Sequence, residues 1–119
     1  MPKKRTRKQV GKYSRTKGAG FERRVVKEFD KYGIIAHRTH FQPFCAHPLP
    51  DITIDTFPDL FIECKKQEHW TLEHYFATGK GKVADWWEQV SKKAKKEKKN
   101  PILVFCRNRS PILVMRSLS

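Results

Sequence analysis

Long apolar runs, cysteine pairs and acidic residues are all scarce in this sequence. No stretch approaches the roughly 20 apolar residues that a membrane span requires, and the basic N-terminal segment lacks the apolar run of a signal peptide. The three cysteines, Cys45, Cys64 and Cys106, form no CxxC pair, which favours buried thiols in a reducing compartment over a disulfide framework. These absences argue against a secreted chain or a membrane protein, so we expect a cytoplasmic location and no membrane contact.

The shortage of acidic residues leaves a large positive charge. The 119 residues include 26 Lys and Arg but only 12 Asp and Glu, which gives a formal net charge of +14. A chain of this size with such a charge is expected to have a polyanion as its partner, and nucleic acid is the first candidate.

The charge is concentrated in two segments. Residues 1–18 contain eight basic residues and no acid, and residues 92–99 contain six lysines and one glutamate, so the remainder is nearly neutral. We predict a basic, flexible N-terminal arm over residues 1–18 that contacts phosphates, followed by one compact domain over residues 19–119. A solubilising or localisation tail is the alternative interpretation of the arm.

The apolar pattern predicts two helices and five short strands. Apolar residues recur at helical spacing from Gly20 to Tyr32 and again from Lys82 to Lys99. Apolar runs over residues 34–38, 51–54, 60–65, 102–106 and 112–115 predict strands. This order predicts an α/β fold with a central mixed β-sheet. One charge breaks the pattern of the first helix, since Glu22 lies within its apolar arc.

The turn at residues 55–59 is expected to bring two carboxylates together. If the turn is tight, Asp51 and Glu63 lie symmetrically about Phe57 and stand side by side across the hairpin. Side-chain alternation points Lys65 to the same face as Glu63. Glu22 can approach that face if its helix packs over the sheet, so three acids and one lysine are expected to converge.

Convergent carboxylates need a counter-ion, because like charges a few ångströms apart cannot all stay ionised. Carboxylate oxygens completed by water suit Mg²⁺, with Mn²⁺ as a substitute. Such an ion polarises a phosphate oxygen while a nearby lysine orients water, so the predicted chemistry is phosphodiester hydrolysis. In the alternative without catalysis, Asp51 caps a strand, and the side chains of Glu63 and Lys65 lie on a solvent-exposed face of the sheet. Asp59 is a second candidate acid, but about 13 Å of extended strand separates it from Glu63.

Two short motifs carry a family resemblance. Pro50-Asp51 followed by Glu63-Cys64-Lys65 resembles the PD-(D/E)XK nuclease signature, and KGAGFER at residues 17–23 resembles the KGxxxER opening of archaeal-type, Hjc-like Holliday junction resolvases. The resemblance covers most of residues 17–116 and includes phage-encoded enzymes as an option. It implies a restriction-endonuclease-like sheet flanked by helices and a homodimer that nicks four-way DNA junctions symmetrically, with no small-molecule cofactor. By this resemblance Glu22, Asp51 and Glu63 are metal-binding catalytic acids and Lys65 is the catalytic lysine.

The setting and the DNA contacts follow from the same interpretation. The enzyme is expected in the cytoplasm beside the nucleoid, or in the host cytoplasm if a phage encodes it. The residues expected to contact DNA are basic or lie near the site: Lys3, Lys4, Arg5, Arg7, Lys8, Lys17, Arg38, Thr39, His40, Lys66, Lys80 and Lys82.

Weaker signals leave alternatives open. A zinc site could be formed by His37, His40, Cys45 and His47, but the spacing of these residues matches no familiar zinc-binding motif. We interpret the histidines as phosphate contacts or plain loop residues. The aromatic residues between positions 70 and 76 could stack on unpaired bases, form a dimer surface or be buried.

Two other functions stay open on the sequence alone. A nuclease of the same fold could act on another DNA substrate, as repair, flap or restriction enzymes do. A ribosomal or architectural protein could bind nucleic acid without catalysis, in which case neutralising Asp51 or Glu63 would change no measured property.

Overall fold

The computed structural model describes residues 7–39 and 46–118, and side chains from Gly18 onward in the first helix. The elements within this part are α1 (Arg7–Lys31), β1 (Ala36–Arg38), β2 (Ile52–Ile54), β3 (Leu60–Lys66), α2 (Leu72–Thr78), α3 (Lys82–Lys96), β4 (Asn100–Cys106) and β5 (Leu113–Arg116). The predicted α/β order is confirmed, with α2 as an addition.

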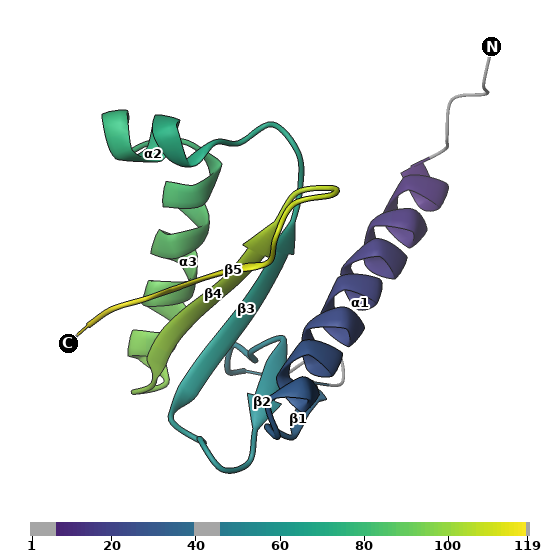
Figure 1. Cartoon of the computed structure of the whole chain (residues 1–119), viewed down its shortest axis with the longest axis vertical. Helices are drawn as coiled ribbons and strands as arrows, with labels where there is room; N and C mark the ends of the chain where they lie inside the picture. The colour runs from purple at the N-terminus through teal and green to yellow at the C-terminus, as the bar shows by residue number, and fades with distance from the viewer. Residues whose placement is uncertain (1–6, 40–45, 119) are drawn as a thin grey trace.

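One mixed sheet forms the centre of the molecule, with its strands in the order β1-β2-β3-β4-β5 (Figure 1). Antiparallel pairing joins β1 to β2, β2 to β3 and β4 to β5, whereas β3 and β4 run parallel. A parallel pair needs a crossover connection, and here α2 and α3 supply it. The predicted central mixed sheet is therefore confirmed.

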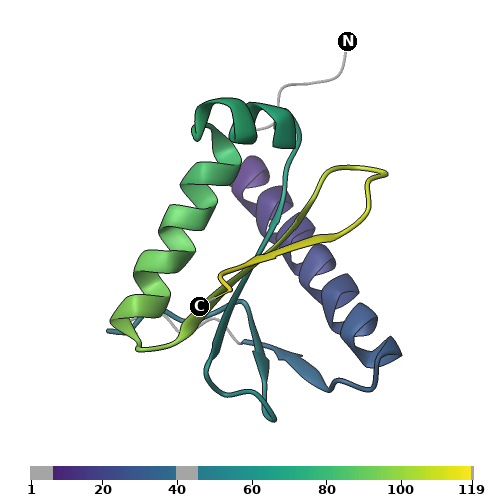
Figure 2. The ribbon, with the colours of Figure 1, turned by 60° about the vertical axis from the view of Figure 1, so that its left-hand side comes forward.

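Helices cover both faces of this sheet, α1 on one side and α3 on the other (Figures 1 and 2). Phe21 and Val25 of α1 pack on Ile52 and Ile62 in one core. On the opposite face, Trp86 and Val90 of α3 pack with Trp70, Phe61 and Phe105 in a second core. These two cores fix the sheet between the helices, and the central strands β3 and β4 each contribute buried side chains to both cores.

Alternation along β3 divides its side chains as predicted. Ile62 lies in the core beneath α1, and Cys64 packs against that core. Phe61 lies in the core beneath α3, and Glu63 bonds to a residue of α3, so these side chains face the other way. A strand that is buried on both faces places a charged side chain such as Glu63 in the interior, where it needs a partner.

The first helix is longer than its apolar pattern predicts. It begins at Arg7, so the backbone of residues 7–18 is helical, where an irregular arm was expected. Lys, Arg and Gln are good helix formers and residues 7–31 contain no proline, which outweighs the low apolar content of this segment. Residues 1–6 of the predicted arm lie outside the described residues.

Local capping explains the differences at the other end of the chain. α2 has no buried residue, so no periodic pattern reveals it; Thr71 caps its start and Gly79, at φ 67°, caps its end. α3 ends at Lys96 and not at Lys99, since Lys98 adopts a φ of 57° and the chain turns into β4.

Among the described residues, no helix has the length and apolar character needed to cross a bilayer.

Candidate active site

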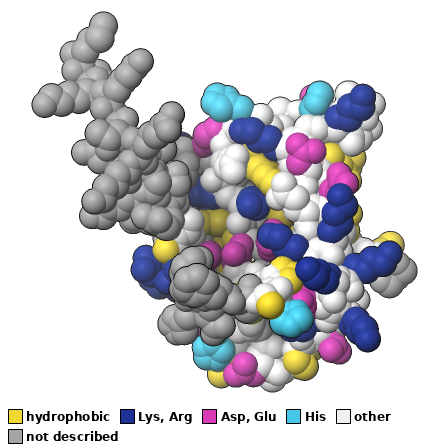
Figure 3. Space-filling model, turned by 180° about the vertical axis from the view of Figure 1, so that it is seen from behind, with side chains coloured by type: hydrophobic (Ala, Val, Ile, Leu, Met, Phe, Trp, Pro, Cys, Tyr) yellow, Lys and Arg dark blue, Asp and Glu magenta, His cyan; other side chains and the backbone are white. Residues whose placement is uncertain are grey.

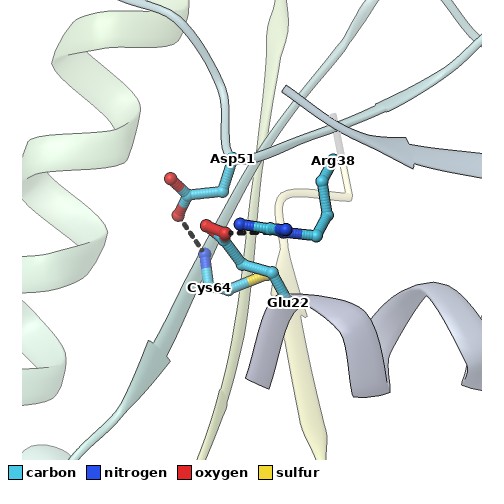
Figure 4. Close-up of polar contacts among 4 residues, drawn as sticks. All are labelled: Glu22, Arg38, Asp51 and Cys64. Atoms are coloured by element: carbon cyan, nitrogen blue, oxygen red, sulfur yellow. Dashed lines mark hydrogen bonds and ion pairs between the residues drawn. The ribbon is translucent and has the colours of Figure 1, made fainter. Parts of the chain in front are cut away.

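The β2–β3 hairpin places Asp51 beside Glu63. Ile52 pairs with Ile62, so the register is symmetric about residue 57, as predicted, and Asp51 stands opposite Glu63. The Asp51 amide donates to the carbonyl of Ile62 at 2.8 Å. One carboxylate oxygen of Asp51, Oδ2, accepts from the amide of Cys64 at 2.8 Å, which fixes the orientation of that carboxylate (Figure 4).

Glu63 is the most buried charge described, with 3% of its surface exposed. Its Oε1 atom accepts from Nζ of Lys93 on α3 at 2.6 Å. Its Oε2 atom is buried and has no hydrogen-bond partner among the described residues. A buried oxygen that lacks a donor is costly, so the arrangement is incomplete as it stands.

Glu22 approaches from α1, on the face of the sheet opposite to Lys93. Its carboxylate lies 3.4 Å from Nε of Arg38 on β1 and points toward Asp51 (Figure 4). Sequence reasoning expected this helix to pack over the face that carries Glu63, and that expectation is wrong. α1 contacts the Ile62 and Cys64 face, so Glu22 reaches the site from the other side.

Burial raises the pKa of two of these acids. The pKa of Asp51 is raised above its ordinary value of 3.8, chiefly by burial; the hydrogen bond from Cys64 opposes this rise and the charge of Glu63 adds to it. The pKa of Glu22 is raised above 4.5, first by burial and then by Asp51, while Arg38 acts in the opposite direction. Both carboxylates would therefore gain from a nearby cation.

Lys65 and Lys93 supply positive charge near Asp51. Each lowers the pKa of Asp51, which opposes the effect of burial. Lys65 follows Glu63 by two residues on β3, so the two side chains leave the same face of the sheet. The predicted juxtaposition of Asp51, Glu63 and Lys65 on one hairpin is therefore present.

Burial and carboxylate charge keep the intervening thiol protonated. The pKa of Cys64 is raised by burial and by the charges of Asp51, Glu22 and Glu63, in that order. Because the thiolate is the nucleophilic form, this cysteine is not suited to covalent catalysis. Its backbone amide, which orients Asp51, is its contribution to the site.

The donor set at the hairpin fits a hard divalent cation. Asp51 and Glu63 offer carboxylate oxygens, and Oε2 of Glu63 is buried without a donor among the described residues. Mg²⁺ is commonly held by one or two carboxylates together with water and substrate phosphate oxygens. Within residues 7–39 and 46–118, no group of three His, Cys, Asp or Glu side chains forms a ready cage. The fit therefore rests on two carboxylates, and the metal role of Glu22 stays a prediction.

The residues expected to contact DNA lie in different places. Arg38 bonds to Glu22, and the amide of Thr39 donates to the carbonyl of Asp51 at 3.0 Å, so both border the site. Lys82 donates to the carbonyl of Glu68 at 2.7 Å, while Lys80 is exposed. The remaining member with a described side chain is Lys66, which is half-buried at the end of β3. Outside the described positions or side chains lie Lys3, Lys4, Arg5, Arg7, Lys8, Lys17 and His40.

Basic and histidine side chains also line a cavity near α2. This cavity of about 430 Å³ lies between α2 and the start of α3, and its lining includes His69, His74, Lys80 and Lys82. Figure 3 shows Lys and Arg side chains interspersed with acidic ones on the face seen from behind.

The zinc alternative receives no support from the two histidines of that set that are described. His37 lies 3.4 Å from Asp55, and His47 lies 3.3 Å from Glu97. Their companions in the proposed set, His40 and Cys45, lie outside the described residues.

The aromatic stretch resolves into two kinds of residue. Trp70 is buried in the core beneath α3, where its ring centroid lies 5.1 Å from that of Phe105. Phe76 is 76% exposed on α2 and contacts Tyr75. Burial therefore accounts for Trp70, whereas Phe76 is accessible for stacking or for contact with another chain.

Lys93 is the site residue that sequence reasoning missed. A run of lysines such as that in residues 92–99 is ordinarily a solvated helix end, and the large net charge favours phosphate contact for it instead. Position 93 nevertheless lies two helical turns after Trp86 and three residues after Val90, on the buried face of α3. A lysine at an apolar position of a helix beside a buried glutamate was the available signal.

Comparison with known proteins assigns the family. Residues 13–119 match the model of the family described as "Phage putative PDDEXK endonuclease", and the chain belongs to this family. The solved structure of Hjc from Archaeoglobus fulgidus, a Holliday junction resolvase from an archaeal hyperthermophile, shares the fold. The TM-score is 0.59 at 23% sequence identity, over 83% of this chain and 76% of that one. No curated protein sequence matches the chain.

The family and the fold define a nuclease of the PD-(D/E)XK class. The restriction-endonuclease-like architecture expected from the sequence is confirmed, and the class acts on nucleic acid, generally with a divalent metal ion. The signature residues Asp51, Glu63 and Lys65 are the ones that the hairpin brings together.

Proposed function

We propose that the protein is a structure-selective, metal-dependent endodeoxyribonuclease that resolves four-way DNA junctions by paired, symmetric nicks. The observation that carries this proposal is the pair of Asp51 and Glu63, in which a buried carboxylate oxygen lacks a donor among the described residues and Lys65 stands beside it. Junction preference is supported by the fold shared with Hjc, whose structure is that of a Holliday junction resolvase, and by the KGAGFER segment at residues 17–23.

The chain's own residues have separate roles in this reaction. Asp51 and Glu63 would hold Mg²⁺, or Mn²⁺ in its place, and the bound ion would supply a Lewis acid for the phosphate and a water of lowered pKa. The amide of Cys64 keeps Oδ2 of Asp51 oriented. Lys65 orients the attacking water or neutralises charge that develops on the phosphate. Glu22, restrained by Arg38, adds negative charge on the α1 side of the site.

Basic residues outside the site hold the phosphates of the DNA. The arm over residues 1–18, with Lys66, Lys80, Lys82, Arg38 and Thr39, forms the proposed contact surface, and such contacts carry no sequence information. Two copies of the chain related by a twofold axis would match the symmetry of a four-way junction and place one site on each of two strands. We expect the enzyme to act in the cytoplasm at the nucleoid, or in a host cell if a phage encodes it.

Cleavage of matched substrates tests the proposal. A labelled four-way junction and a linear duplex of the same sequence are incubated with the protein in Mg²⁺ and in chelator. Paired nicks on opposing strands of the junction, in the Mg²⁺ reaction alone, are the expected result. Preferential cutting of flaps, damaged DNA or the linear duplex would keep the nuclease and reject the junction, and cutting in chelator would reject metal dependence.

A pair of variants tests the site itself. Asp51→Asn is expected to abolish nicking while junction binding is retained. Asp59→Asn is the matched control, because Asp59 is exposed and its described bond, from the amide of Asn100, uses only its backbone carbonyl. Equal nicking by the two variants would reject Asp51 as a catalytic residue, and a wild type that binds the junction but does not nick it would favour a nucleic-acid-binding protein without catalysis.

A further inference from the structure

Lys93 is turned inward, unlike the lysines beside it. Its ammonium lies 2.6 Å from Oε1 of Glu63, a residue 30 positions away on β3. Lys92 instead projects to solvent and pairs with Glu88 one turn earlier on the same helix. Lys93 therefore makes the contact to the site that its neighbours in α3 do not make.

This contact leaves the Glu63 carboxylate half satisfied. One oxygen receives the ammonium, and the other is buried without a donor in the described part of the chain. A buried carboxylate must have a counter-charge, and in the protein without metal Lys93 supplies it. The same carboxylate is the one that the proposed function assigns to a divalent cation.

A divalent cation and Lys93 cannot both bind Glu63 without opposing one another. Two positive charges a few ångströms apart repel by an amount that is substantial even at the intermediate dielectric of a protein surface. The Lys93 side chain is 43% exposed, whereas that of Glu63 is 4% exposed. The lysine thus has access to water and can leave the carboxylate without displacement of α3, which the buried residues Val90 and Ala94 anchor.

We propose that Lys93 is a place-holding counter-ion: its ammonium neutralises Glu63 in the protein without metal, and the divalent cation displaces it. This inference rests on the proposed function, in that Glu63 holds the cation. Lys93 is a positioning residue and is distinct in role from Lys65. Its loss has effects of opposite sign on two properties, because it stabilises the metal-free protein and competes with the metal.

Measurements on Lys93→Met and Lys92→Met test this competition. Mn²⁺ is titrated into each full-length protein by calorimetry, and thermal unfolding is followed with and without Mn²⁺. Lys93→Met is expected to lower the Tm of the metal-free protein and to bind Mn²⁺ about tenfold more tightly than the wild type. Lys92→Met, which removes the same charge from the same helix, is expected to match the wild type in both measurements. Unchanged or weaker Mn²⁺ affinity in Lys93→Met would overturn the proposal.

Two further variants keep the result interpretable. Lys93→Gln keeps a hydrogen-bond donor for Glu63 without the charge, so it is expected to bind Mn²⁺ more tightly even if Lys93→Met folds poorly. In the Glu63→Gln background, Lys93→Met should cause no further loss of Tm, since the ion pair is already absent. Additive losses would overturn the assigned pairing.

Titration of the wild type with Mn²⁺ distinguishes failure of the proposed metal site from failure of the role proposed for Lys93. If the wild type binds no Mn²⁺ at a site that Glu63→Gln removes, the proposed metal site fails and the role of Lys93 fails with it. If that site is present and Lys93→Gln binds Mn²⁺ no more tightly, the role of Lys93 alone is overturned.

Discussion

The two faces of the sheet hold their acidic residues in different ways. On the α1 face, Glu22 and Arg38 lie 3.4 Å apart and both side chains keep some exposure, 18% and 34%. On the α3 face, Glu63 is almost completely buried and lies 2.6 Å from Lys93. Each face pairs an acid with a base, but only the α3 face leaves a buried carboxylate oxygen without a donor among the described residues.

The Glu22–Arg38 pair is screened by water, whereas the buried Glu63 needs a positive charge close to it. Partly exposed ion pairs contribute little to stability, because water screens the charges and supplies alternative partners. A buried carboxylate depends on whatever cation is present. The α3 face is therefore where metal, lysine and protein stability are coupled, whereas the α1 face adjusts the charge around Asp51.

The largest expected effect is on the nicking rate, when the acid of one face or of the other is neutralised. Glu63→Gln should lower the rate of junction nicking by about 10³-fold or more, because it removes a metal ligand. The loss of nicking rate in Glu22→Gln should be smaller than that in Glu63→Gln by a factor of about ten, since Glu22 approaches Asp51 from the other side of the sheet. Single-turnover nicking in Mg²⁺ measures both. Equal losses in the two variants would mean that the faces do not differ in this respect.

Removing the basic partner on each face should separate the two pairs in stability. Lys93→Met is expected to destabilise the metal-free protein by about 2 kcal/mol, less than a fully buried pair would lose because Lys93 is partly exposed. Arg38→Met should cost about 1 kcal/mol or less. Urea denaturation in chelator gives both values. A larger loss for Arg38→Met would reverse the comparison.

The raised pKa values predict how stability depends on pH. A carboxyl whose pKa is higher in the folded than in the unfolded protein contributes stability that is present below the unfolded pKa and lost as pH rises through the folded pKa. For Asp51 and Glu22 that loss begins above ordinary values of 3.8 and 4.5.

Metal and the Asp51→Asn variant test that dependence. In chelator at pH 7, Asp51→Asn is expected to be more stable than the wild type, and the difference should vanish below about pH 4. Mg²⁺ at 100 times its Kd should stabilise the wild type at pH 7 by about 2.7 kcal/mol and leave the variant nearly unchanged. A wild type that becomes relatively more stable as pH rises, in chelator, would contradict the sign.

The smallest effect is expected from the basic residues 3–5, which lie outside the described residues and which we assign to the phosphate-binding arm. Replacing Lys3, Lys4 and Arg5 by Gln should weaken junction binding mainly at low salt. In a plot of the logarithm of the binding constant against that of the salt concentration, the slope should fall by about 0.9 for each phosphate that the variant no longer neutralises. The nicking rate at saturating protein should stay the same. An unchanged slope would mean that this segment binds no phosphate.

Much of the α3 face could be predicted from short-range patterns. Alternation and a symmetric turn give the register that sets Asp51 opposite Glu63, because a hairpin's pairing follows from its turn length. Lys65 follows from the same alternation. These are local relations along one hairpin, which is why the sequence contains enough information to predict them.

The remaining features depend on packing between distant elements. The side of the sheet that α1 covers is decided by which apolar faces match, so the approach of Glu22 could not be derived from its own helix. The contact of Lys93 with Glu63 joins α3 to β3 across 30 residues, so it could not be predicted from either element alone. Only the place of Lys93 on the apolar face of its helix was visible in the sequence. α2 has no buried residue, so it carries no hydrophobic period to predict it.

A crystal of the protein grown with Mn²⁺ tests the central claim most directly, through the anomalous signal of the metal. We predict one peak per chain between the carboxylates of Asp51 and Glu63, bonded to Oε2 of Glu63, with the Lys93 ammonium withdrawn from Oε1. A protein that nicks junctions in Mn²⁺ but shows no peak at these two carboxylates, or a peak bound by other residues, would contradict the account.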